Sequence, residues 1–165
     1  MKTALDWQRW HDEQTDLWNT VPGGAELIAL LGKCPSFHDG EIVQLTLNRR
    51  ANSGIEIHIF PDITSSKKDG VQKQNTIPNM VVTLTLGPIL HLQLDGFSAQ
   101  NVIGNLTLAR GKARLDQENS YSGKVEATDY ELEFEPCFGV DGWIHTRSLS
   151  ISFKIGKPSD YLPPT

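Results

Sequence analysis

The densest group of side chains able to do acid–base chemistry lies in residues 36–41, where His38 and Asp39 are adjacent. A hydrolase would use His38 as the base, Asp39 as the carboxylate that orients it, and a distant Ser or Cys as the nucleophile. Adjacent side chains of an extended chain point to opposite sides, which places these two poorly for a mutual bond. We therefore favour a structural role, in which Phe37 fills the core and His38 or Asp39 satisfies free backbone groups.

Metal and cofactor sites have no clear signature in the spacing of the residues. No two of the five histidines stand at i+2 or i+4, as a compact metal site usually requires: His11, His38, His58, His91 and His145. His58 and His91 fall at alternating positions of two different expected strands, where they could converge, but two histidines on a polar sheet face are favoured. Phosphate-binding glycine motifs are absent. The sequence predicts no catalytic residue, no metal site and no cofactor.

The two cysteines, Cys34 and Cys137, adjoin prolines and have no neighbouring basic residue that would activate them, so inert thiols are expected. Two cysteines are also too few for a disulfide scaffold. No apolar run reaches the roughly 18 residues that a membrane-spanning helix needs, and the first ten residues lack the apolar core of a secretory signal. These observations predict a cytoplasmic protein with no membrane partner.

Charge is unevenly distributed along the chain. The protein has 15 basic and 20 acidic residues and a net charge of −5, a balance that disfavours a nucleic-acid partner. Residues 115–141 hold eight acids and one base. Within them Glu131, Glu133 and Glu135 alternate with apolar residues, which places three carboxylates on one face of a strand. Two interpretations stay open: a solvated face that protects an edge strand, and a docking surface for a basic partner.

The expected elements that position these groups form a single domain over residues 1–165. Two short helices within residues 5–31 show helical spacing of apolar side chains, and from residue 41 the period changes to two. We expect an α+β fold in which these helices pack on a predominantly antiparallel sheet of about seven strands over residues 41–155, open or curled into a sandwich or half-barrel. Residues 61–78 are expected to form a long exposed hairpin loop, residues 143–155 to contain one strand, and residues 156–165 a mobile tail.

Two segments together resemble a known family. PSFHDGEI (residues 35–42) leads into an alternating strand, and LQLDGFSAQNVI (residues 92–103) follows another. They resemble the immunity protein 50 family of bacterial polymorphic toxin systems, whose members carry an sFHD-x-E-hydrophobic segment and a GFN-x-QN-hydrophobic turn. The likeness runs from about residue 27 to residue 153, and Ser98 stands where the family carries Asn.

The resemblance implies a small cytoplasmic protein without catalytic activity, which neutralises a cognate protein toxin by binding it. Shared motifs in such families often hold the scaffold, so these motif positions are expected to be structural: Phe37, His38, Asp39, Glu41, Gly96, Phe97, Gln100 and Asn101. If the toxin is a nuclease with a basic cleft, the row of Glu131, Glu133 and Glu135 is the candidate surface to occupy it.

Two other functions remain open from the residues. One is a small hydrolase or ligand-binding enzyme that uses His38, Asp39, His58 or His91 in a cleft. The other is a housekeeping interaction domain with no toxin as its partner. One tightly bound zinc per chain at His58 and His91 would favour the enzyme, and a toxin-domain gene directly upstream would favour an immunity protein over a housekeeping domain.

Overall fold

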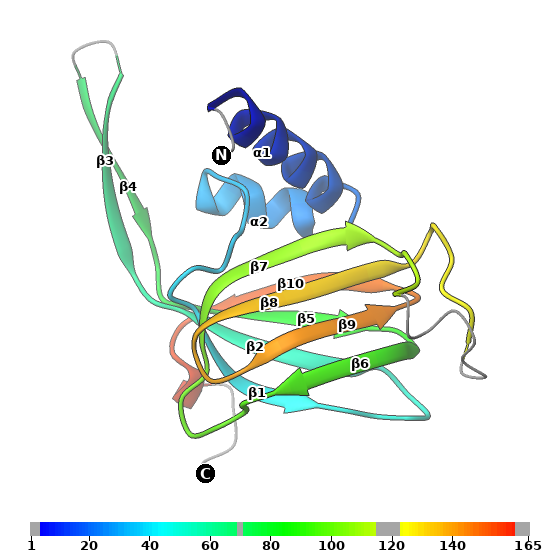
Figure 1. Cartoon of the computed structure of the whole chain (residues 1–165). Helices are drawn as coiled ribbons and strands as arrows, with labels where there is room; N and C mark the ends of the chain where they lie inside the picture. Colours follow the sequence, from blue (N-terminus) through cyan, green and yellow to red (C-terminus); the bar gives the residue numbers. More distant parts are fainter. Residues whose placement is uncertain (1–3, 69–70, 115–122, 161–165) are drawn as a thin grey trace.

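A computed structural model describes residues 4–68, 71–114 and 123–160 (Figure 1). Helices α1 (Ala4–Asn19) and α2 (Gly24–Leu31) come first, and a 3-10 turn (Pro158–Asp160) comes last. Between them lie ten strands: β1 (Glu41–Thr46), β2 (Ser53–Ile59), β3 (Asp62–Lys68), β4 (Val71–Ile77), β5 (Met80–Leu86), β6 (Ile89–Asp95), β7 (Val102–Arg110), β8 (Tyr130–Phe138), β9 (Asp141–Thr146) and β10 (Leu149–Ile155). The predicted α+β class is confirmed, with eight strands in the main sheet.

The main sheet is antiparallel throughout and has the order β10-β5-β2-β1-β7-β8-β9-β6. Its two halves join at β1 and β7, whose ladder consists of the single pair Glu41↔Val102. Other neighbours pair over most of their length. The sheet bends at this sparse junction, so that β7-β8-β9-β6 lies over β10-β5-β2-β1 as a second layer (Figure 1). This is the curled form of the expected sheet.

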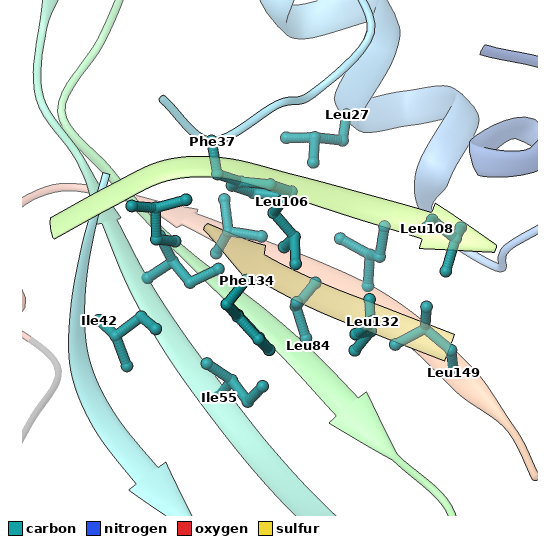
Figure 2. Close-up of a cluster of buried hydrophobic side chains, with 14 of the residues drawn as sticks. Leu27, Phe37, Ile42, Ile55, Leu84, Leu106, Leu108, Leu132, Phe134 and Leu149 are labelled. Atoms are coloured by element: carbon teal, nitrogen blue, oxygen red, sulfur yellow. The ribbon is translucent and has the colours of Figure 1, made fainter. Parts of the chain in front are cut away.

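The core lies between the two layers, as alternation along the strands requires. Ile55 and Leu84 from one layer meet Leu132 and Phe134 from the other (Figure 2). The helices close one open side of this core through three side chains, Trp18, Leu27 and Leu31. The outward face of β8 is therefore the face that carries its glutamates.

Two expectations about the strands were wrong. Residues 143–155 contain parts of two strands, β9 and β10, because the chain changes layer between them at Arg147 and Ser148. Strand β8 pairs with β7 on one side and β9 on the other, so it is not an edge strand. The edges of the sheet are β10 and β6, and the glutamates of β8 have no edge to protect.

Residues 61–78 form a hairpin, as expected, but with two paired strands in place of a loop. Strands β3 and β4 project from the body of the protein (Figure 1) and pair from Asp62↔Ile77 to Lys68↔Val71. Part of the expected mobile tail is ordered, because Pro158–Asp160 forms the 3-10 turn, while residues 161–165 lie outside the described residues. No helix among the described residues is both long and apolar enough to cross a membrane.

Candidate functional site

The two motif segments lie side by side, far apart though they are in the sequence. The Ile42 N–H donates to the Asn101 carbonyl at 2.8 Å, and the Ile103 N–H donates to the Gly40 carbonyl at 2.9 Å. In return, the Ile103 carbonyl accepts from the Asp39 N–H at 2.9 Å. These bonds continue the β1–β7 contact beyond its single ladder pair, so the motifs together make the junction of the two layers.

Three motif residues have the structural role expected of them. Phe37 is buried and packs edge-on against Trp18, with ring centroids 5.7 Å apart. Buried Asn101 accepts from the Ser98 N–H at 2.9 Å and donates to the Ser98 carbonyl at 2.8 Å, which closes the turn before β7. Gly96 has φ 70°, and a Cβ there would stand 2.5 Å from a carbonyl oxygen of the β8–β9 turn.

His38 and Asp39 do not satisfy buried backbone groups, because their side chains are 60% and 75% exposed. The two side chains contact each other, with His38 Nδ1 3.0 Å from Asp39 Oδ2. The expectation that they point to opposite sides was wrong, since it assumed an extended chain. Phe37 and Asp39 have φ values of 55° and 63°, a left-handed conformation that costs a non-glycine residue on the order of 1–3 kcal/mol.

A third chemically active side chain, that of Cys137, lies beside this pair. Val102 pairs with Phe138 and Ile103 with Pro136, so Cys137 is the extra residue of a β-bulge in β8. A bulge re-aims the side chain of its extra residue. The Cys137 sulfur and one ligand atom each of His38 and Asp39 all lie within 4.8 Å of one another. Sequence reasoning missed this neighbour, although a proline inside a strand pattern marks a bulge or an edge.

A cavity of about 310 Å³ opens next to the His38–Asp39 pair. Its walls combine the pair with apolar side chains from the end of α2, the loop after it, the β2–β3 junction and the end of β4: Leu31, Phe37, Phe60, Pro61 and Ile77. His38 and Asp39, two of the four residues named in the hydrolase hypothesis, line this cavity.

His58 and His91 are not brought together. His58 is nearly buried on β2, where its Nε2 lies 3.1 Å from Asn79 Oδ1. His91 lies on β6 in the other layer, with its ring centroid 6.2 Å from that of His145. Neither belongs to a group of metal-capable side chains among the described residues. The alternative in which they converge is wrong.

The three glutamates of β8 lie on one face, as predicted, but have different environments. Glu131 is 15% exposed and accepts from Arg114 at 3.0 and 3.3 Å and from the Nε2 of His145, which is fully buried. The Arg114 guanidinium also lies 4.6 Å from the ring centroid of Trp143. The Glu131 carboxylate therefore helps to hold the Arg114 side chain against the sheet. Glu133 is half exposed near Arg114, and Glu135 is exposed.

Strands β2, β6 and β8 end, and β9 begins, at one end of the two layers (Figure 1). Exposed acids and exposed phenylalanines stand at or next to these strand ends in the sequence. Asp95 and Asp141 are exposed and directly opposite each other in the β6–β9 ladder. Phe60, Phe97 and Phe138 are 48%, 54% and 65% exposed. Phe97, which was expected to be structural, is thus more than half exposed. We call this surface the acidic–aromatic end: Asp39, Asp95, Glu135, Asp141, Phe60, Phe97 and Phe138.

Comparisons of the chain with protein-family models, with curated proteins and with solved structures gave no match. The resemblance of the two motifs to the immunity protein 50 family therefore stays a prediction.

Proposed function

We propose that the protein is a non-enzymatic binding protein, an immunity protein that neutralises a cognate bacterial toxin in the cytoplasm through its acidic–aromatic end. The observation that carries the proposal is the exposure of three phenylalanines on one end of the fold. Burying such a side chain is worth about 1.5–3 kcal/mol, and aromatic residues are enriched at the centres of protein interfaces. A protein partner that covers them gains this free energy.

The charges of the same surface favour a basic partner. Cross-strand neighbours such as Asp95 and Asp141 have Cβ atoms about 4.5–5.5 Å apart, and like charges at that separation repel. Among the described residues, neither these two aspartates nor Glu135 forms an ion pair. A cation from the partner would relieve the repulsion. Toxin nucleases hold phosphates in basic clefts, which fit this surface, whereas nucleic acid itself would be repelled.

We expect the gene of this protein to stand directly beside a gene for a toxin-domain protein, and the test uses that protein, purified and in co-expression; the absence of such a gene would speak against the proposal. We expect the wild type to bind it and to restore growth of cells that produce it. The double variant Asp95→Lys/Asp141→Lys should associate at least about tenfold more slowly at low salt, because charge reversal removes steering. Asp16→Lys/Glu26→Lys is the matched control, since it makes the same charge change on the exposed faces of α1 and α2. Equal association rates for the two double variants would refute the assignment of this surface.

One observation favours a second candidate, a cysteine hydrolase. Cys137, His38 and Asp39 are the residue types of a nucleophile, its base and the carboxylate that orients the base. Their exposure speaks against it, because a solvated Asp39 carboxylate holds the imidazole weakly. A hydrolase predicts turnover of ester or peptide substrates that is lost in Cys137→Ala and kept in Cys34→Ala. Absence of such turnover leaves the binding function.

A further inference from the structure

We propose that His38, Asp39 and Cys137 form a binding site for a divalent metal ion of the zinc class, with three protein ligands and one open coordination position. The proposal does not depend on the toxin, because it concerns the isolated chain. Each residue offers a different ligand atom, an imidazole nitrogen, a carboxylate oxygen and a thiolate sulfur, and zinc accepts all three.

The backbone of Ile103 explains why these ligands meet. Its N–H and carbonyl bond Gly40 and Asp39 on one side, which fixes the loop that carries His38. On its other side Ile103 pairs with Pro136, the residue before Cys137 in the bulge. One residue of β7 thus holds the two halves of the site at a fixed separation, although they come from distant parts of the chain.

Local conformation turns the side chains toward a common point. The left-handed φ of Asp39 brings its carboxylate to the side of His38, which an extended chain would not allow. The bulge removes Cys137 from the regular alternation of β8. Gly104, next to the bulge, lets the strands approach, since a Cβ there would stand 3.0 Å from the Glu135 carbonyl oxygen. Strained backbone and a bulge at one place are typical of functional sites.

The distances suit tetrahedral coordination after small side-chain rotations. Zinc bonds of about 2.0–2.2 Å to nitrogen and oxygen place those two atoms roughly 3.3–3.5 Å apart, and sulfur at about 2.3 Å lies roughly 3.6 Å from the nitrogen. The structure has 3.0 Å between His38 Nδ1 and Asp39 Oδ2, and at most 4.8 Å between any two of the three ligand atoms. All three side chains are exposed, so small rotations about their side-chain bonds can shorten the longest of these distances by the roughly 1 Å that tetrahedral coordination requires.

The ligand set also selects the metal and leaves room for a fourth ligand. A thiolate beside an imidazole favours zinc and its chemical relatives over magnesium and calcium, which prefer oxygen ligands alone. Zinc in proteins is usually four-coordinate, so three protein ligands leave one position for water or an external ligand. His38 and Asp39 also line the cavity of about 310 Å³, which leaves room for water or a small ligand beside these two side chains.

The experiment titrates the reduced, tag-free full-length protein with Co²⁺, which reports a thiolate ligand by its charge-transfer absorption, and then with Zn²⁺ in competition. We expect one Co²⁺ per chain with that absorption, displaced by Zn²⁺. Cys137→Ser should abolish the absorption, and His38→Gln and Asp39→Asn should each weaken binding at least about tenfold, on the scale of losing a supporting partner. Cys34→Ser and His11→Gln are the matched controls and should bind as the wild type does, because neither residue belongs to the cluster.

Three results would overturn the proposal: no thiolate absorption in the wild type, the same absorption in Cys137→Ser, or unchanged affinity in both His38→Gln and Asp39→Asn. Circular dichroism of each variant checks that it is folded, and the exposed positions of the three ligands make unfolding an unexpected outcome. Failure of toxin binding would leave these results unaffected.

Discussion

Removing the carboxylate of Glu131 should destabilise the fold, although it belongs to a row of glutamates that looks uniform in the sequence. The carboxylate is the partner of Arg114 and of the His145 Nε2. His145 is fully buried, and its Nδ1 already has no hydrogen-bond partner. Glu131→Ala leaves both ring nitrogens without partners and removes the two hydrogen bonds that Arg114 donates to this carboxylate.

The size of the effect follows from these contacts. Leaving a buried polar group without its partner costs about 1–3 kcal/mol, and breaking a buried charged pair about 3–5 kcal/mol. Because Glu131 is 15% exposed and Arg114 is 34% exposed, solvent screens part of their attraction. We expect Glu131→Ala to lower the free energy of unfolding by about 2–4 kcal/mol. Glu131→Gln should cost less, since its amide oxygen still accepts one of these hydrogen bonds.

Urea unfolding followed by circular dichroism measures the difference in the free energy of unfolding between wild type and variant. An unchanged m-value shows that the surface exposed on unfolding is the same in both proteins. Glu135→Ala is the matched control, because this glutamate is exposed on the same strand and face and its loss should stay within about 0.5 kcal/mol. If the two alanine variants have the same stability, the cluster around His145 does not hold the sheet, and the reasoning fails.

Other outcomes follow from the same contacts. His38→Ala and Asp39→Ala should each change the free energy of unfolding by less than about 1 kcal/mol in chemical denaturation, because both side chains are exposed; a loss above 2 kcal/mol would restore the structural role. Gly96→Ala should lower the melting temperature by several degrees, because φ is 70° and a carbonyl oxygen would lie 2.5 Å from the new Cβ. Burial raises the pKa of the Cys34 thiol, partly offset by a hydrogen bond. At pH 8 less of that thiol is ionised, so mass spectrometry should find iodoacetamide on exposed Cys137 first; the reverse order would contradict the burial.

The spacing of apolar residues predicted most of the helices and strands, but it did not predict which strands are neighbours in the sheet. The alternation through Leu132 and Phe134 identified β8 and the face that its glutamates share. It could not say that strands flank β8 on both sides, because pairing partners are set by the tertiary fold. It also missed that Glu131 is covered, since Arg114, which packs against it, comes from a separate segment.

Only part of the candidate site could be predicted from the sequence, because its third member is brought in by the tertiary fold. His38 and Asp39 stood out because they are adjacent in the sequence. Their contact depends on a left-handed φ at Asp39, a conformation that is uncommon for a non-glycine residue and that no spacing rule anticipates. Cys137 reaches them through a bulge and through hydrogen bonds of Ile103, which are long-range features.

The change of layer at Arg147 and Ser148 has a consequence for folding during synthesis. The chain first crosses between the layers at Gly87 and Pro88, and that crossing is completed only when the Gly87 N–H bonds the Ser148 carbonyl. Strand β10 then covers the edge of β5, a strand rich in Val and Leu. Until residues 149–155 leave the ribosome, this apolar edge is open to pairing with another chain, a state that invites aggregation. A nascent chain that lacks β10 is therefore the form most in need of a chaperone.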